Sequence, residues 1–435
     1  MLECKTIVIA KMHQIMASHP PSLIRLLRLA TLLAGAHAAG AAAQAADDMP
    51  GQHWSFAGYG SAGVVHSSDR QSDFSSNVIN PGRAGYTKRY SYDVDSRLAG
   101  QVNYESGADW SAVLQVISER NLDNDFVPKV EWANLRYRIS PELSVRIGRT
   151  ALPIFLLGDY RKASYALPWV RPPIEVYGGL PISNSDGVDV SYSWRAGGVK
   201  NVSQGSFGRT QVRTGNGSHA TARQLVGVSN TTTTNNLTVR ASVMTAALTV
   251  DIAKPLFDAF SQFGAPGTAL AHRYDVAATR TSVAAIGFTY DPGSWFLMGE
   301  TGRLNTRSYL GNKSVYYLSS GYRWRAFTPY VTYSGARSHQ ALSDPGLPVS
   351  SYPAALAPLA SGLNAELNGL LRTITVQHTV SAGVRWDVAR DYSLKVQYDR
   401  LRPEGQSNGS LINVQPGFRT ADPVHVVSAM LDFVF

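Results

Sequence analysis

Apolar and polar side chains alternate at every second residue in many short segments of this 435-residue chain. In residues 375–388, TVQHTVSAGVRWDV, Val380 and Trp386 fall on one face and Thr379 and Arg385 on the other. Successive side chains of a strand point to opposite faces, so this period predicts strands with one apolar and one polar face. Because such segments recur as far as the C-terminus, we predict an all-β protein.

The connections between these segments are of two kinds. Very short turns, such as 141–142 and 325–326, alternate with long polar loops, such as 338–371 and 402–423. Charged residues lie in mid-strand on the polar face, where a water-filled interior accommodates them and lipid does not; they are Arg146, Arg323, Arg385 and Lys395. This arrangement predicts a transmembrane antiparallel β-barrel with short periplasmic turns and long extracellular loops.

The barrel must close on itself, because every backbone amide in a bilayer needs a hydrogen-bond partner. At roughly 24 residues for each strand and its connection, the chain predicts about 16 strands, a size that leaves an open aqueous channel. The alternative is a large secreted β-sandwich or propeller. Aromatic residues crowd the strand ends, as they do where a barrel wall meets the membrane–water interface.

The N-terminal residues 1–45 have the pattern of a removed secretory signal peptide. Arg25 and Arg28 precede an apolar run at 29–43, and Ala43-Gln44-Ala45 fits a cleavage site. The run is shorter than a membrane-spanning helix requires. The only cysteine, Cys4, falls within this segment. We therefore expect one domain, residues 46–435, with no disulfide and no thiol chemistry.

Two short motifs suggest chemistry that the surrounding sequence does not support. Gly58-Tyr59-Gly60-Ser61-Ala62-Gly63 matches a dinucleotide-binding fingerprint, but no helical pattern follows it, so we interpret it as the first strand. Gly405-Gln406-Ser407-Asn408-Gly409 matches a nucleophile elbow but lies in a polar loop. The histidines show no metal-ligand spacing. We expect no cofactor, no metal, no nucleic-acid partner and no enzymatic activity.

The C-terminal sequence MLDFVF places Leu431, Phe433 and Phe435 on one strand face. It resembles the C-terminal signature of Gram-negative outer-membrane barrels, which their assembly machinery recognises. Residues 135–155 and 378–400 are similar to strand pairs of the Gram-negative porin superfamily. This resemblance implies a bacterial outer-membrane protein surrounded by lipid, usually a homotrimer, that lets small hydrophilic solutes and ions diffuse passively. The chain lacks the acidic PEFGG motif of enteric general porins, which leaves its constriction chemistry open.

We predict that the segment 151–185 determines the selectivity of such a channel. Its five prolines interrupt strand pairing, yet its aromatic residues are unusual for a solvated loop. We predict a loop folded into the barrel as a constriction; the alternative is an outer loop packed on the rim or a neighbouring subunit. The candidate selectivity residues in and near it are Arg136, Arg138, Arg146, Arg149, Asp159, Arg161, Lys162, Arg171 and Glu175.

Positive charges outnumber negative ones seven to two in this set, which favours a mild preference for anions. Strand parity directs Arg136, Arg138 and Arg146 into the lumen, together with Trp132 and Asn134, and Arg149 to the other face. Two further segments, 255–265 and 352–373, predict short helices in outer loops. An adhesin or structural barrel is the alternative function, followed by a barrel-embedded hydrolase.

Overall fold

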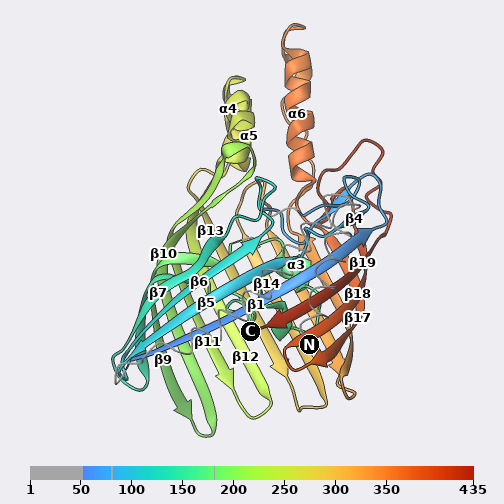
Figure 1. The fold of residues 1–435 in the computed structure, drawn as a ribbon. Coiled ribbons are helices and arrows are strands. Elements are labelled where there is room, and N and C mark those ends of the chain that lie inside the picture. Colours follow the sequence, from blue (N-terminus) through green and yellow to red (C-terminus); the bar gives the residue numbers. More distant parts are fainter. Residues whose placement is uncertain (1–51, 80–81, 181) are drawn as a thin grey trace, which may run out of the picture.

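The computed structural model describes residues 52–79, 82–180 and 182–435, so the expected signal peptide lies outside the described residues. Sixteen antiparallel strands form one closed barrel (Figure 1). In chain order they are β1 (Gln52–Ser67), β5 (Arg97–Ser106), β6 (Trp110–Glu119), β7 (Lys129–Arg138), β8 (Leu143–Ala151), β9 (Asn184–Ala196), β10 (Val199–Arg213), β11 (His219–Thr233), β12 (Leu237–Val250), β13 (Thr279–Tyr290), β14 (Trp295–Asn305), β15 (Lys313–Tyr322), β16 (Phe327–Ser338), β17 (Gln377–Ala389), β18 (Tyr392–Pro403) and β19 (Val424–Val434).

Each strand pairs with its neighbours in sequence, and β1 closes the ring by pairing with both β5 and β19. Three two-residue strands lie in the loop between β1 and β5, namely β2 (Asp73–Phe74), β3 (Ala84–Gly85) and β4 (Tyr90–Ser91). Closure leaves no unpaired sheet edge, as a membrane-embedded sheet requires. The predicted fold class is confirmed.

The outer wall is apolar. Val228, Val243 and Ile286 are 63%, 60% and 51% exposed on this isolated chain. In each strand, the residues two positions before and after them point to the same outer face. Such a surface is stable only against lipid. Tyrosine, tryptophan and phenylalanine crowd the outer face near the short turns, where an aromatic ring can lie in the membrane interface. The barrel therefore spans a membrane with its polar face inward.

The seam between the first and last strands explains the N-terminal glycine motif. Tyr59 pairs with Val434 and Gly60 with Phe433. The aromatic ring of Phe433 occupies the space above Gly60, where an added Cβ would lie 2.1 Å from the ring, and Phe435 lies above Gly58 in the same way at 2.2 Å. The two phenylalanine rings stack with centroids 6.3 Å apart. These glycines thus make room for the C-terminal rings.

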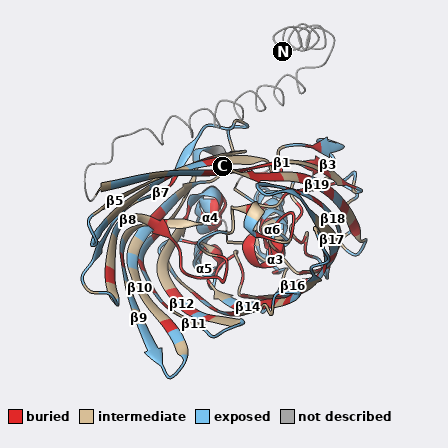
Figure 2. Ribbon diagram, turned by 60° about the horizontal axis from the view of Figure 1, so that its bottom comes forward, coloured by how far each residue is buried: buried red, intermediate tan, exposed pale blue. Residues whose placement is uncertain are grey.

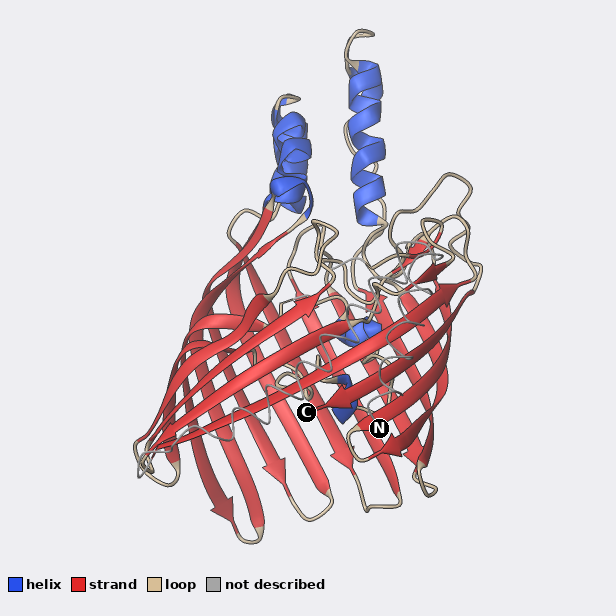
Figure 3. Cartoon of the chain, viewed as in Figure 1, coloured by secondary structure: helices blue, strands red, loops and turns tan. Residues whose placement is uncertain are grey.

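Helices extend above the barrel on the side of the long loops (Figures 1 and 3). The predicted helical segments are confirmed as α4 (Lys254–Ser261), α5 (Gly264–Tyr274) and α6 (Ala357–Leu371). They share an apolar core that includes Phe257, Phe260 and Leu367. Short 3-10 turns occur at Gly215–Gly217, Asp251–Ala253 and Val349–Ser351. In the described part of the chain, no helix has the length and apolar character needed to cross a membrane.

The connection between β8 and β9 enters the barrel instead of extending outward. Residues 152–183 carry a 3-10 turn, η1 (Ser164–Ala166), and a short helix, α3 (Ile174–Tyr177), both inside the ring of strands (Figures 2 and 3). We call the described residues of 152–183 the inner loop, and its course confirms the prediction that one loop folds into the barrel.

Candidate permeation pathway

Apolar packing holds the inner loop against one side of the barrel. Its buried side chains include Phe155, Leu157 and Trp169, which contact inward-facing residues of β11 to β16 such as Met298 and Tyr317. The Trp169 indole N–H also donates to Ser319 and Thr332 at 2.9 and 3.0 Å. The tryptophan is thereby fixed by both burial and hydrogen bonds. The loop covers most of this side of the wall, so the opposite side, β1 and β5 to β10, lines most of any passage, with Thr231 of β11 and Arg240 of β12 at its periplasmic end.

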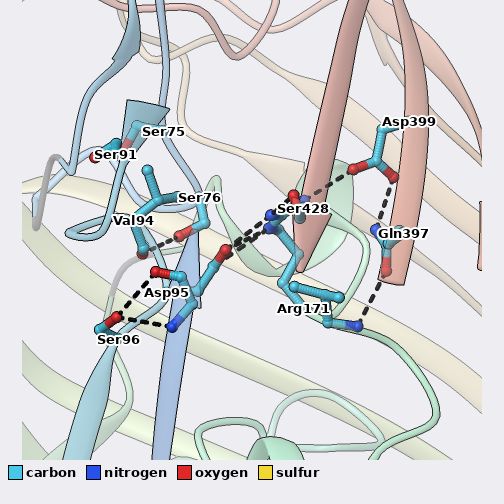
Figure 4. Close-up of polar contacts among 12 residues, drawn as sticks. Ser75, Ser76, Ser91, Val94, Asp95, Ser96, Arg171, Gln397, Asp399 and Ser428 are labelled. Carbon is cyan, nitrogen blue, oxygen red and sulfur yellow. Dashed lines mark hydrogen bonds and ion pairs between the residues drawn. The ribbon is translucent and has the colours of Figure 1, made fainter. Parts of the chain in front are cut away.

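A buried arginine fastens the loop at the extracellular end (Figure 4). The Arg171 guanidinium forms ion pairs with Asp95 at 2.7 Å and with Asp399 at 2.8 Å, and it also donates to Ser428. Its Cζ lies 5.0 Å from the centre of the Phe74 ring. These partners come from the loop before β5 and from β18 and β19, so one side chain ties the inner loop to three distant parts of the chain.

Other charged residues reinforce this attachment. The Glu175 carboxylate accepts hydrogen bonds from Ser334, Gln377 and Thr379. The Lys395 ammonium donates to the Trp169 carbonyl at 3.0 Å and pairs with Asp432 at 2.8 Å. Two further wall residues act on loop backbone. Arg385 donates to the carbonyl oxygens of Tyr165 and Leu167, and Glu300 accepts from the Leu156 N–H.

Lys162, at the free edge of the loop, bridges to the opposite wall. Its ammonium lies 2.7 Å from Glu119 of β6 and 3.0 Å from Glu131 of β7. Burial alone would lower the pKa of Lys162, but the two carboxylates outweigh burial and raise it. The lysine is therefore charged at neutral pH and its charge is neutralised locally. The adjacent Arg161 donates to the Leu180 carbonyl at 3.0 Å.

Three cavities follow one another along this loop edge. The extracellular one is about 70 Å³, the middle one about 230 Å³ and the periplasmic one about 720 Å³. The first two share the lining residues Arg161 and Lys162. The middle and periplasmic cavities share Gln101, Trp132 and Asp159. The last cavity reaches the short turn at Pro141 and Glu142. Together they trace a path from the extracellular loops to the periplasmic turns.

Comparisons with known proteins support the fold. Neither a family model nor a curated protein matches this chain. Among solved structures it is similar to OmpF of Salmonella typhi in complex with daunomycin, with a TM-score of 0.54 and 12% identity over 88% of this chain and 98% of OmpF. It is also similar to the outer-membrane channel DcaP of Acinetobacter baumannii, with a TM-score of 0.50 and 11% identity over 89% of this chain and 99% of DcaP. The chain has the fold of outer-membrane porins. Its fold is therefore that of a porin-type barrel.

The porin-type barrel brings some of the candidate selectivity residues to the path. Arg136 and Arg146 line the periplasmic cavity, and Arg146 pairs with Asp189 at 2.9 Å. Arg138 pairs in register with Ser144, which lines the same cavity. Asp159 and Arg161 lie at the loop edge, as described above.

The remaining candidates lie elsewhere. Arg149 pairs with Asp186 at 2.7 Å, on the face that carries Val188 and Val190 of the outer wall. Glu175 is buried, and its carboxylate is engaged by wall residues. Arg171 borders the extracellular cavity, but it is buried and its charge is engaged by Asp95 and Asp399. The alternation of side chains along the strand had already predicted that Arg149 lies on the opposite face from Arg146. The partners of Arg171 could not be found from the sequence, because Asp95 and Asp399 lie far from it along the chain.

Three basic residues on the path were absent from the sequence-based set. Arg97 of β5 and Arg120, directly after β6, line the extracellular cavity, and Arg240 of β12 lines the periplasmic one. Arg97 and Arg240 fall at inward positions of their strands, so strand parity was the signal that could have found them. As for metals, the described residues contain no cluster of three or more histidine, cysteine, aspartate or glutamate side chains able to hold an ion.

Proposed function

We propose that this protein is a channel for the passive diffusion of small hydrophilic solutes and ions, with a weak preference for anions. The observation that carries the proposal is the series of three cavities that share lining residues from the extracellular loops to the periplasmic turns. The inner loop narrows this path without filling it. A rigidly anchored loop suits a passive pore, since the constriction keeps a fixed size.

The anion preference is assigned to basic groups on the path that have no acidic partner. Among the described residues, Arg136 forms no ion pair, Arg161 bonds only to a backbone carbonyl, and Arg240 bonds only to Ser229. Lys162 and Arg146 also line the path, but carboxylates neutralise them. Acidic side chains on the path oppose this preference and keep it weak; they are Asp159 at the loop edge, Glu119 and Glu131 around Lys162, Asp93 at the extracellular cavity, and Glu105 and Glu142 at the periplasmic cavity. Fixed charges in a narrow pore with low-dielectric walls select the sign of the permeant ion.

We also propose that the barrel assembles as a homotrimer after export and is recognised by the barrel assembly machinery through Leu431, Phe433 and Phe435. Phe433 and Phe435 lie on the outer face at the periplasmic end of the last strand, and Phe435 is 39% exposed. A trimer would show conductance steps in multiples of three.

Single-channel recording in a planar bilayer under a salt gradient tests both parts of the proposal. The wild type is expected to conduct, with a reversal potential on the anion-selective side. R136Q and R161Q should each move it towards cations, because each removes an unneutralised positive charge from the path. R149Q is the matched control, since it removes the same charge from the outer wall. A cation-selective wild type would refute the charge assignment. A protein that inserts but passes no current would refute the channel and leave an adhesin or structural role.

A further inference from the structure

The wall of the middle cavity carries a tryptophan beside two amide side chains. Trp132 of β7 pairs in register with Gln115 of β6, and Gln115 pairs with Gln101 of β5. The three residues therefore lie at one height on neighbouring strands, and all three line the cavity. The Gln115 side-chain N–H donates to the Gln101 side-chain oxygen at 2.7 Å. An indole ring thus lies next to two linked amide groups.

A β-bulge gives Trp132 its inward position. The register between β6 and β7 shifts at Glu131, which has no partner in this pairing. Adjacent residues of a regular strand point to opposite faces. Here Glu131 pairs with Lys162 of the inner loop while Trp132 lines the cavity, so both face inward. Bulges often redirect a side chain next to a functional site, and this one adds an aromatic ring to the path.

The Trp132 side chain is available for contact with a solute. The structure describes all eight tryptophans of the chain. Each of the others contacts an aromatic ring, an arginine or a hydrogen-bonding group, as Trp169 and Trp110 do. Among the described residues, the Trp132 side chain has no such partner, and it is only half-buried. Its ring face and its N–H donor are therefore open to the cavity.

The inner loop places a second free aromatic residue on the other side of the cavity. Tyr160 is 41% exposed although the loop lies inside the barrel. Its hydroxyl and ring have no hydrogen-bond or stacking partner within the described part of the chain. The neighbouring Asp159 also lines the cavity and forms no ion pair there. The loop thus presents an aromatic ring and a free hydrogen-bond acceptor to the row on the wall.

The charges that line the middle cavity balance each other. Glu131 and Lys162 form an ion pair, and Asp159 and Arg161 add one charge of each sign. A cavity without net charge does not concentrate ions of either sign. The amide groups of the wall remain able to donate and accept, because each amide has two N–H groups and two lone pairs. The lining therefore suits a neutral solute with many hydrogen-bonding groups.

Sugars have the chemistry that this lining recognises. A pyranose ring presents a face of C–H groups, which packs on the negative face of an aromatic ring. Its hydroxyls donate to carboxylate and amide oxygens and accept from amide N–H groups. A cavity of about 150 Å³ holds a benzene ring. The middle cavity is about 230 Å³, which leaves room for a six-membered ring with its hydroxyls.

We propose that the middle cavity is a binding site for one pyranose unit of a neutral sugar. Trp132 provides the stacking surface, Gln101 and Gln115 bind hydroxyls from the wall, and Tyr160 and Asp159 contact the sugar from the loop. The inference deepens the proposed function and rests on it, because a solute reaches this cavity along the path. Trp132 and Gln101 also line the periplasmic cavity, so a bound sugar has a route onward.

Saturation-transfer NMR on the folded protein, in a detergent without a sugar headgroup, measures the binding directly. The probes are methyl glucoside, sorbitol and alanine. The wild type should bind the glucoside, and should bind sorbitol, which has no ring face, at least about tenfold more weakly. W132A and Y160A should each weaken glucoside binding about tenfold, since each removes an aromatic face, and W132F should retain most of it. W110A is the matched control, because Trp110 lies on the outer wall.

Single-channel currents with the same probes separate this inference from the proposed function. The glucoside should interrupt the wild-type current reversibly, and the interruptions should be about tenfold shorter in W132A. Glucoside binding in a barrel that passes no current would support the site and refute the channel.

Three results would overturn the inference, whatever the current shows. These are equal binding of glucoside and sorbitol, binding of alanine instead of the glucoside, which would indicate a site for zwitterions, and full glucoside binding by both W132A and Y160A. Each variant is first checked for a heat-modifiable band on an unboiled gel, so that only folded barrels are compared. Trp132 and Tyr160 belong to different elements, so misfolding of one variant still leaves a test.

Discussion

At the scale of single residues, Gly60 and Phe433 show how the two ends of the barrel sequence fit each other. The ring of Phe433 is almost completely buried although it lies on the outer face, because Gly60 provides the space it occupies. Gly60 belongs to a series of glycines with the spacing of a nucleotide-binding loop, but its role here is to make room for an aromatic ring. The role of these glycines was not visible in the sequence, since their partners lie at the other end of the chain.

Replacing Gly60 by alanine is predicted to impair closure of the barrel. The new Cβ would lie 2.1 Å from the Phe433 ring, and such overpacking costs about 1–3 kcal/mol. The folded fraction, measured as the heat-modifiable band, should fall at increasing urea concentration. G100A is the control, because an added Cβ at Gly100 of the paired strand meets nothing within 4 Å. If G60A and G100A are equally stable, the ring does not determine the seam.

The basic residues of the inner loop show the limit of counting charges. Arg161, Lys162 and Arg171 look equivalent in the sequence, but only Arg161 remains without a carboxylate partner among the described residues. The partners of the other two come from strands distant in sequence. The count of seven positive against two negative charges therefore overstates the positive charge of the path, and the anion preference rests on fewer groups.

At the scale of elements, the inner loop depends on its buried ion pairs more than on its own secondary structure. Its helical parts are only a single turn each. Its position inside the barrel was predictable from its prolines and aromatic residues. The apolar inner wall that receives it was not, because the alternation rule predicts a polar inner face on every strand. In β14, Phe296 and Met298 face inward and Leu297 faces outward, so both faces are apolar.

R171Q is predicted to loosen the loop. Removing the guanidinium leaves Asp95 and Asp399 as buried charges without a cation, and breaking a buried pair in this way costs about 3–5 kcal/mol. The variant should melt at a lower temperature in detergent and show noisier single-channel currents. The triple variant R171M/D95N/D399N should recover most of the melting temperature, since it removes the charges together. An unchanged melting temperature in R171Q would show that apolar packing alone holds the loop.

At the scale of the whole molecule, one requirement governs the fold: backbone amides in lipid must pair with one another. This requirement made the closed barrel and its strand number predictable from alternation, turns and length. It does not determine what the interior conducts, because side chains from distant strands set the size and charge of the path.

The most direct test of the account is the current through a single channel that carries a cysteine at the loop edge. The only native cysteine, Cys4, lies in the expected signal peptide, so D159C would provide one reactive thiol between the middle and periplasmic cavities. A bulky water-soluble thiol reagent is predicted to reduce the D159C current sharply, and to leave V228C, on the outer wall, unchanged. An undiminished D159C current after complete labelling would contradict a path along the inner loop.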